Sequence, residues 1–297
     1  MHIIVNNTSM VPIYEQIMDH IVKSYNDFTL DCSMEIQPGC ITGLIGQNGA
    51  GKTTTFKAIL NLIDPDGGTV ELFGKKVENL TAQDKQKLGV ALSDSGFSEQ
   101  LTIQDVIHIL KAMYPSFVDK KFINCCQKFQ LPMEKKLKEF STGMKAKFKV
   151  IVALSHEAQF LILDEPTVGL DVVARDEVLE LLHDYMEEDE SRSILISSHI
   201  SSDLESLCDD IYMLHEGKIV LHEETDRLLD DYALLKPSKE QLETMDKEYI
   251  LKYKEETYGC RCLTNQKQYY MENYPEVVLE KGNIDDLMAL MIGGKEL

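Results

Sequence analysis

The sequence predicts an α/β fold with a mostly parallel core sheet, because short apolar strands alternate with helical patterns and end in polar groups. Residues 41–45 (ITGLI) run into the glycine-rich loop 46–53. Residues 160–165 (FLILDE) end in two carboxylates, and residues 193–199 (SILISSH) end in a histidine. Since the carboxyl ends of parallel strands meet at one edge of a sheet, we expect these groups to lie together.

Length and composition set limits on the kind of protein. The chain has 297 residues, 43% of them hydrophobic and 27% charged, which is typical of a soluble globular protein with one large or two small domains. No apolar run reaches the roughly 18 residues of a membrane span, and the first residues lack a signal-peptide pattern, so a cytoplasmic protein is expected. The net charge of -20 would repel a phosphate backbone, and no nucleic-acid partner is expected. The seven scattered cysteines have no zinc-ligand spacing and are expected to be reduced.

The first part of the chain changes pattern near Tyr25. Isoleucines at Ile13, Ile17 and Ile21 are four apart, which predicts a short helix over residues 11–24. From Tyr25 to residue 36, apolar and polar side chains alternate and predict a strand. Tyr25 precedes the glycine-rich loop at a distance from which its ring could stack on a nucleotide base. A strand-end tyrosine without a ligand is the alternative.

The loop that follows the strand at residues 41–45 fits the phosphate-binding pattern G-x-x-x-x-G-K-[ST]. Its glycines let backbone N–H groups surround phosphates at the start of the next helix. Lys52 is expected to reach the β- and γ-phosphates and Thr53 to ligate Mg²⁺. The expected nucleotide contacts are Gly46, Gln47, Asn48, Gly49, Ala50, Gly51, Lys52, Thr53 and Thr54.

The pattern in the middle of the chain predicts two portions of an α/β core that are separated by a run of helices. We expect a helix over residues 52–63, strands over 69–74 and 88–94, and a helix started by Thr102 and stopped by Pro115. Further helices are predicted around residues 120–129 and from Met133. Residues 95–140 are therefore interpreted as a helical insertion.

The strand at residues 160–165 supplies the expected catalytic groups. Asp164 is suited to hold Mg²⁺, and Glu165 is suited to polarise an attacking water. His199 ends the next strand and could donate to the γ-phosphate or orient Glu165. A purely structural histidine is the alternative at that position. A helix is expected over residues 172–186, a hairpin over 211–222, and exposed helix or linker over 236–256.

The ordered motifs GQNGAGKTT, STGMK, FLILDEP, GLD and SSH resemble those of the ATP-binding subunit of an ABC transporter, over about residues 20–222. The resemblance implies a P-loop NTPase cassette with a mostly parallel core sheet, an antiparallel β subdomain and a helical insertion, followed by a small C-terminal extension. It also implies that Tyr25 stacks on adenine. Ser141 and Gly143 would form the signature motif, in which Thr142 replaces the usual second glycine. Asp171 would be the D-loop aspartate and His199 the switch histidine.

Two other resemblances concern the ends of the chain. Residues 3–22 are similar to the opening of GntR-type transcription regulators, but the further helices and wing of that domain are absent. The tail resembles that of exporter ATPases of the bacitracin and YtrB type. The expected division is a GntR-like segment 1–22, a nucleotide-binding domain 23–222 and an extension 223–297. Whether the first cassette strand is intact stays open, with residues 3–5 as a substitute.

The family resemblance implies the cofactors ATP and Mg²⁺, a second ATPase subunit in a homo- or heterodimer, and an integral membrane permease. In that arrangement the signature motif of one subunit closes over the ATP of the other. The implied function is export of a drug, peptide or related small cargo, with this chain bound peripherally on the inner face of the cell membrane. The alternatives are a non-transport ABC ATPase and, with less support, a DNA-binding regulator.

One position departs from the family pattern. The family usually has a glutamine after the strand LGVAL, where it contacts Mg²⁺ and the membrane partner, and this chain has Ser93 and Asp94. A carboxylate can ligate Mg²⁺, which favours Asp94 as the substitute, although the alignment could shift by one residue.

Overall fold

The centre of the structure is a six-stranded sheet that carries the predicted strand-end groups. The computed structural model describes residues 16–94, 96–257 and 259–296. The strand order in this core sheet is β10-β9-β3-β8-β7-β6, and all neighbours are parallel except the hairpin pair β9 and β10. The strands are β3 (Ile41–Ile45), β6 (Leu88–Ala91), β7 (Phe160–Asp164), β8 (Ser193–Ser198), β9 (Asp210–His215) and β10 (Lys218–Glu224).

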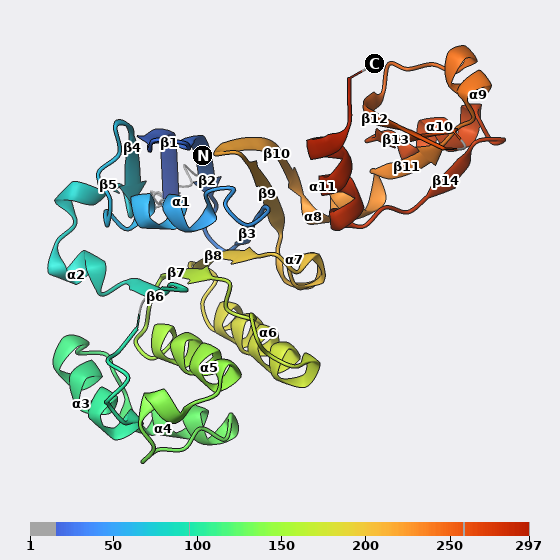
Figure 1. The fold of residues 1–297 in the computed structure, drawn as a ribbon. Helices are drawn as coiled ribbons and strands as arrows, with labels where there is room; N and C mark the ends of the chain where they lie inside the picture. Colours follow the sequence, from blue (N-terminus) through green and yellow to red (C-terminus); the bar gives the residue numbers. More distant parts are fainter. Residues whose placement is uncertain (1–15, 95, 258, 297) are drawn as a thin grey trace, which may run out of the picture.

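An antiparallel sheet of order β2-β1-β4-β5 packs above the core sheet (Figure 1). Its strands are β1 (Gln16–Ser24), β2 (Thr29–Ile36), β4 (Gly67–Leu72) and β5 (Lys75–Lys76). The helix predicted over residues 11–24 is therefore wrong for residues 16–24, and residues 11–15 lie outside the described part. The pairing register shifts between Met18 and Ile21, where His20 has a φ of 48°. This bulge places Met18 and Ile21, three residues apart, on one buried face, which imitates the spacing of a helix.

Residues 16–24 thus form a strand where the family resemblance requires the first strand of the cassette. The end of the GntR-like segment 1–22 belongs to the antiparallel sheet and pairs with both β2 and β4. This placement removes support for a DNA-binding helix at residues 16–22. The suggestion that residues 3–5 replace the strand concerns residues outside the described part.

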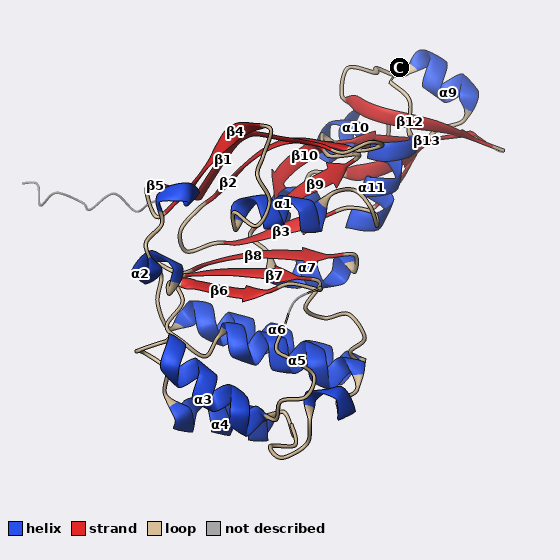
Figure 2. Cartoon of the chain, turned by 60° about the vertical axis from the view of Figure 1, so that its left-hand side comes forward, coloured by secondary structure: helices blue, strands red, loops and turns tan. Residues whose placement is uncertain are grey.

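Helices cover both faces of the core sheet (Figure 2). Helix α1 (Lys52–Ile59) lies between the core sheet and the antiparallel sheet, and α5 (Thr142–Ala153) and α6 (Val172–Glu187) lie on the opposite face. Side chains of β7 point alternately to the two faces of the core sheet. Phe160 and Ile162 pack toward α1, whereas Leu161 and Leu163 pack toward α5 and α6. Two short helices, α2 (Ala82–Lys85) and α7 (Ser201–Leu207), follow β5 and β8.

The predicted helical insertion is present and contains α3 (Ile103–Met113) and α4 (Asp119–Lys128). Thr102 begins α3 with a capping box, as its position before the apolar pattern indicated. The helix predicted from Met133 is wrong, because residues 136–138 pair with the backbone before α3: Leu137 N donates to Leu101 O and Lys138 N to Glu99 O, both at 2.9 Å. Only a short 3₁₀ turn forms, at Leu137–Glu139.

The C-terminal extension contains a small sheet of order β12-β13-β11-β14. Its elements are α8 (Thr225–Asp230), β11 (Ala233–Lys236), α9 (Lys239–Thr244), β12 (Ile250–Glu256), β13 (Gly259–Thr264), α10 (Lys267–Asn273), β14 (Val278–Glu280) and α11 (Ile284–Gly293). Exposed helix or linker was predicted over residues 236–256, and within this range the structure has one helix, α9. The prediction is wrong for residues 250–256, which form the edge strand β12. Helix α11 contacts α7, where Ser201 Oγ donates to Asp285 Oδ2 at 2.8 Å and Ile284 N donates to Glu205 Oε1 at 2.9 Å.

Among the described helices, none combines the length and the apolar character that crossing a membrane requires.

Candidate active site

A cavity of about 670 Å³ opens where the phosphate loop meets the ends of β6, β7 and β8. The strand-end groups that the sequence predicted therefore do meet at one edge of the core sheet. The residues that the loop, the strand ends and α5 contribute include Gly49, Lys52, Thr53, Ser93, Thr142, Lys149, Asp164, Glu165 and His199.

The phosphate loop has the conformation that its glycines permit. Gly49 and Gly51 have φ values of 85° and 115°, which favour glycine. A Cβ on Gly46 would lie 2.4 Å from Leu214 O, so the loop also approaches β9 too closely for any other residue. Helix α1 begins at Lys52, directly after Gly51, and its first residues line the cavity. The first N–H groups of a helix have no partner within the helix and can bind an anion. This arrangement suits an anion such as a phosphate.

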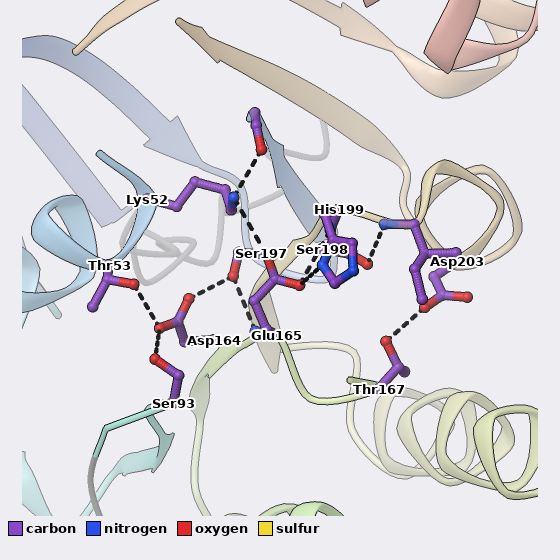
Figure 3. Close-up of polar contacts among 12 residues, drawn as sticks. Lys52, Thr53, Ser93, Asp164, Glu165, Thr167, Ser197, Ser198, His199 and Asp203 are labelled. Atoms are coloured by element: carbon purple, nitrogen blue, oxygen red, sulfur yellow. Dashed lines mark hydrogen bonds and ion pairs between the residues drawn. The ribbon is translucent and has the colours of Figure 1, made fainter. Parts of the chain in front are cut away.

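Lys52 is the buried cation of the site, with 7% of its surface exposed. Its Nζ donates to Gly46 O at 2.7 Å and lies 3.3 Å from Glu165 Oε1. The lysine thus connects the phosphate loop to the carboxylate that follows β7 (Figure 3). A phosphate held by the loop would meet this charge.

Three hydroxyl groups hold the buried carboxylate of Asp164 (Figure 3). Asp164 Oδ2 accepts from Thr53 Oγ1 at 2.8 Å and from Ser93 Oγ at 2.7 Å, while Oδ1 accepts from Ser197 Oγ at 2.7 Å. A carboxylate next to hydroxyl oxygens is the hard-oxygen donor set that Mg²⁺ takes alongside substrate phosphates. The residues present therefore fit a Mg²⁺ ion held by Thr53 and Asp164.

Glu165 lies between Lys52 and His199. Its Oε2 lies 2.6 Å from His199 Nδ1 and accepts from His199 N at 3.2 Å. The Glu165 backbone has a φ of 53°, an uncommon conformation for this residue type, and its N–H is fixed by Ser197 Oγ at 3.0 Å. The orienting role of His199 stays a prediction, and its contact with Glu165 is consistent with that role.

Asp94 does not join the candidate metal ligands, which corrects the sequence prediction. Its Oδ2 pairs with Lys57 Nζ of α1 at 2.6 Å, and this hydrogen bond lowers the pKa of Asp94. Ser93 contacts Asp164 instead. Ser93 and Asp94 lie in the turn that follows β6, where their side chains contact different elements, β7 and α1.

Tyr25 directly follows β1, is 48% exposed and is not among the residues that line the cavity. The aromatic ring that lines the cavity is that of Phe28, whose centroid is 6.3 Å from that of Tyr25. Either ring is therefore within reach of a base that extends from the phosphate loop. The stacking role of Tyr25 stays a prediction.

We expect Tyr25→Ala to weaken ATP binding by about tenfold, because a base stacked on an aromatic ring gains roughly 1–3 kcal/mol. Fluorescence titration with an ATP analogue would measure the change, and a triphosphate without a base provides the control, since its affinity should stay the same. If Phe28→Ala produces the loss and Tyr25→Ala does not, the stacking ring is Phe28.

Ser141 and Asp171, which the resemblance assigns to the signature motif and the D-loop, lie at the starts of two helices. Ser141 Oγ accepts from Met144 N at 3.2 Å at the start of α5, and Asp171 Oδ1 accepts from Ala174 N at 2.9 Å at the start of α6. The two segments touch, because a Cβ on Gly143 would lie 3.2 Å from Gly169 O. Ser141 and Asp171 are exposed and do not line the cavity of their own chain.

A buried polar cluster behind the site was not predicted from the sequence. Asp203 of α7 is 1% exposed, accepts from Thr167 Oγ1 at 2.7 Å and lies 3.1 Å from Arg175 Nε of α6. The cluster connects the loop after Glu165 to the helix that follows His199 (Figure 3). No local motif indicates a contact between residues so far apart along the chain.

We expect Asp203→Ala to lower the free energy of unfolding by about 3 kcal/mol, because it leaves the Thr167 hydroxyl and the Arg175 guanidinium without their partner. Urea unfolding measures the difference. Glu177→Ala is the control, since the Glu177 carboxylate pairs with Lys147 nearer the surface and should contribute less than about 1 kcal/mol. Equal effects of the two substitutions would contradict the prediction.

Comparisons with known proteins identify the family of the chain. A family model described as "ABC transporter" matches residues 30–168, and one described as "AAA domain, putative AbiEii toxin, Type IV TA system" matches residues 135–202. The chain is 33% identical over 208 residues to the ABC transporter ATP-binding protein YtrB of Bacillus subtilis (strain 168), which covers 70% of each chain. It is 32% identical over 225 residues to the bacitracin transport ATP-binding protein BcrA of Bacillus licheniformis, covering 74% of this chain and 69% of BcrA.

Solved structures share the fold. A structure titled "Structure of ATP binding subunit of ABC transporter" superposes with a TM-score of 0.65 at 25% identity and covers 72% of this chain and 92% of its own. A dimeric ATP-binding cassette in a post-hydrolysis state with ADP and Pi superposes with a TM-score of 0.63 at 19% identity, covering 71% of this chain and 99% of its own. Because the chain is 33% identical to YtrB over an alignment that covers 70% of each chain, it belongs to the ATP-binding subunits of ABC transporters and is a transport ATPase.

Proposed function

We propose that this chain lies on the inner face of the cell membrane and hydrolyses ATP to drive an exporter whose permease is a separate integral membrane protein. The observation that carries the proposal is the single cavity in which the phosphate loop, Asp164, Glu165 and His199 meet. Relatives named for bacitracin and lantibiotic transport favour export of a peptide or related small cargo.

The site supports a division of work among its residues. The phosphate loop and Lys52 bind the phosphates, and Thr53 and Asp164 hold Mg²⁺, which when bound neutralises charge on the phosphate oxygens. Glu165 accepts a proton from the attacking water, and His199 keeps the Glu165 carboxylate in place through the contact at 2.6 Å.

A second ATPase subunit, identical or related, completes the site in this proposal. Ser141 and Asp171 are exposed. Three valines at or shortly before the start of α6 are exposed as well: Val168 (37%), Val172 (65%) and Val173 (69%). Exposed valines next to helix-start polar groups suit a protein contact. The partner's signature motif would then close over ATP on this chain.

The permease is proposed to dock beside the helical insertion. A groove of about 680 Å³ lies between the end of β6 and helices α3 and α5, and its lining includes Phe97, Tyr114 and the half-exposed Met113. The groove is mainly apolar and adjoins Ser93, which contacts Asp164. Docking here would connect the membrane partner to the ATPase site.

The test is ATP hydrolysis by the purified chain, alone and in membranes with its permease. We expect Mg²⁺-dependent phosphate release from the wild type and none from Lys52→Ala. Co-purification of an integral membrane protein that depends on Met113 and Phe97 would support the permease assignment. A folded wild type that binds no ATP would overturn the proposal.

A further inference from the structure

Lys149 of helix α5 reaches from the helical side of the molecule to the end of strand β6. Its Nζ donates to Leu92 O at 2.8 Å and to Ser93 O at 2.9 Å. The side chain lines both the candidate active site and the groove beside the helical insertion. Burial lowers the pKa of Lys149, while the nearby carboxylates of Asp94 and Asp164 oppose that shift.

The segment that Lys149 holds, residues 92–94, has two further attachments. Ser93 Oγ donates to Asp164 Oδ2 at 2.7 Å, and Asp94 Oδ2 pairs with Lys57 Nζ of α1 at 2.6 Å. Residues 92–94, here called the β6 junction, therefore connect α5, α1 and the end of β7. Because Lys149 fixes the backbone of Ser93, it also restrains where the Ser93 hydroxyl can point.

We infer that Lys149 is a positioning residue of the ATPase site, which holds the β6 junction so that Ser93 orients the Asp164 carboxylate toward Mg²⁺. This inference rests on the proposed metal role of Asp164. Hydrogen bonds from an ammonium are roughly twice as strong as neutral ones, so two of them can restrain a strand end that has left its sheet. A displacement of α5 would then reach Asp164 through Lys149 and Ser93.

Two other roles for Lys149 make different predictions. If the ammonium bound a phosphate directly, its removal would weaken nucleotide binding whether or not Mg²⁺ was present. If the contact only held α5 against the core, its removal would lower stability without changing the response to Mg²⁺. The dependence of nucleotide affinity on Mg²⁺ therefore separates a positioning role from both.

The experiment measures the binding of a fluorescent, non-hydrolysable ATP analogue in excess Mg²⁺ and in EDTA. For Lys149→Met we expect about a tenfold loss of nucleotide affinity in Mg²⁺ and no change in EDTA. A tenfold loss is the lower end of the effect of removing a group that orients a metal ligand. Lys149→Arg keeps a cationic donor and should recover most of the loss. Lys147→Met removes a lysine from the same helix that pairs with Glu177, and should show no loss.

A double substitution tests the path through Ser93. If Lys149 acts by placing the Ser93 hydroxyl, Ser93→Ala should show the same selective loss in Mg²⁺, and adding Lys149→Met should lower the affinity little further. Equal losses in EDTA and Mg²⁺, full additivity of the two substitutions, or a folded Lys149→Met variant with wild-type affinity would each overturn the inference. If the wild type itself gains no affinity from Mg²⁺, the proposed metal role fails, and the inference fails with it.

Discussion

Replacing Glu165 with glutamine is expected to lower the rate of ATP hydrolysis by about 10²–10⁴-fold, the usual contribution of a positioned general base. The Glu165 carboxylate lies 3.3 Å from Lys52 Nζ and 2.6 Å from His199 Nδ1. Glutamine fills the same volume but cannot accept the proton of an attacking water. Nucleotide binding should remain, because the phosphate loop supplies it.

Phosphate release and analogue binding, measured on the same preparation, test this prediction. The Glu165→Gln variant should bind ATP, and size-exclusion chromatography should show a dimer that forms with ATP and persists, because hydrolysis no longer reopens it. Lys52→Ala is the control, since it removes the buried cation and should lose nucleotide binding. If Glu165→Gln retains the wild-type rate, another group activates the water.

The architecture and most of the site could be predicted because the signals are local. The phosphate loop, the carboxylates after β7 and the histidine after β8 each directly follow an apolar strand, and the rule that parallel strands share a carboxyl edge brings them together. The mostly parallel core sheet, the antiparallel sheet and the helical insertion are confirmed by the structure. Helix α3 was bounded correctly to within two residues because Thr102 and Pro115 carry its start and stop signals.

The failed predictions involve contacts that the local pattern does not contain. In β1, one bulge at residues 19–20 brings Met18 and Ile21 to the same face, so a strand acquires the spacing of a helix. At the end of β6, only the three-dimensional direction of the chain decides that Ser93 faces Asp164 and that Asp94 faces Lys57.

The contact between Asp203 and Thr167, 36 residues apart, is buried behind the site and follows no motif. Such contacts depend on how α7 packs against the loop after β7, which periodicity does not encode.

The turn between β9 and β10 supports the phosphate loop, so a substitution there should have the second large effect. Gly217 has a φ of 78°, and a Cβ at this position would lie 2.0 Å from Thr29 O of β2. Gly217 N donates to Ala50 O of the phosphate loop at 2.9 Å, and Asp31 N donates to Gly217 O at 2.7 Å. The turn therefore joins the loop to β2, and it cannot accept a side chain without separating them.

We expect Gly217→Ala to lower the free energy of unfolding by roughly 2–5 kcal/mol, combining about 1–2 kcal/mol of backbone strain with about 1–3 kcal/mol of overpacking. ATP affinity should fall as well, because the phosphate loop loses its contact with the turn. Gly49→Ala is the control in urea unfolding: Gly49 has a φ of 85° but nothing within 4 Å of a Cβ, so only the strain should appear. Equal destabilisation by the two substitutions would contradict the prediction. It would show that the turn between β9 and β10 adjusts to a side chain, so that the close approach of this turn to β2 does not support the phosphate loop.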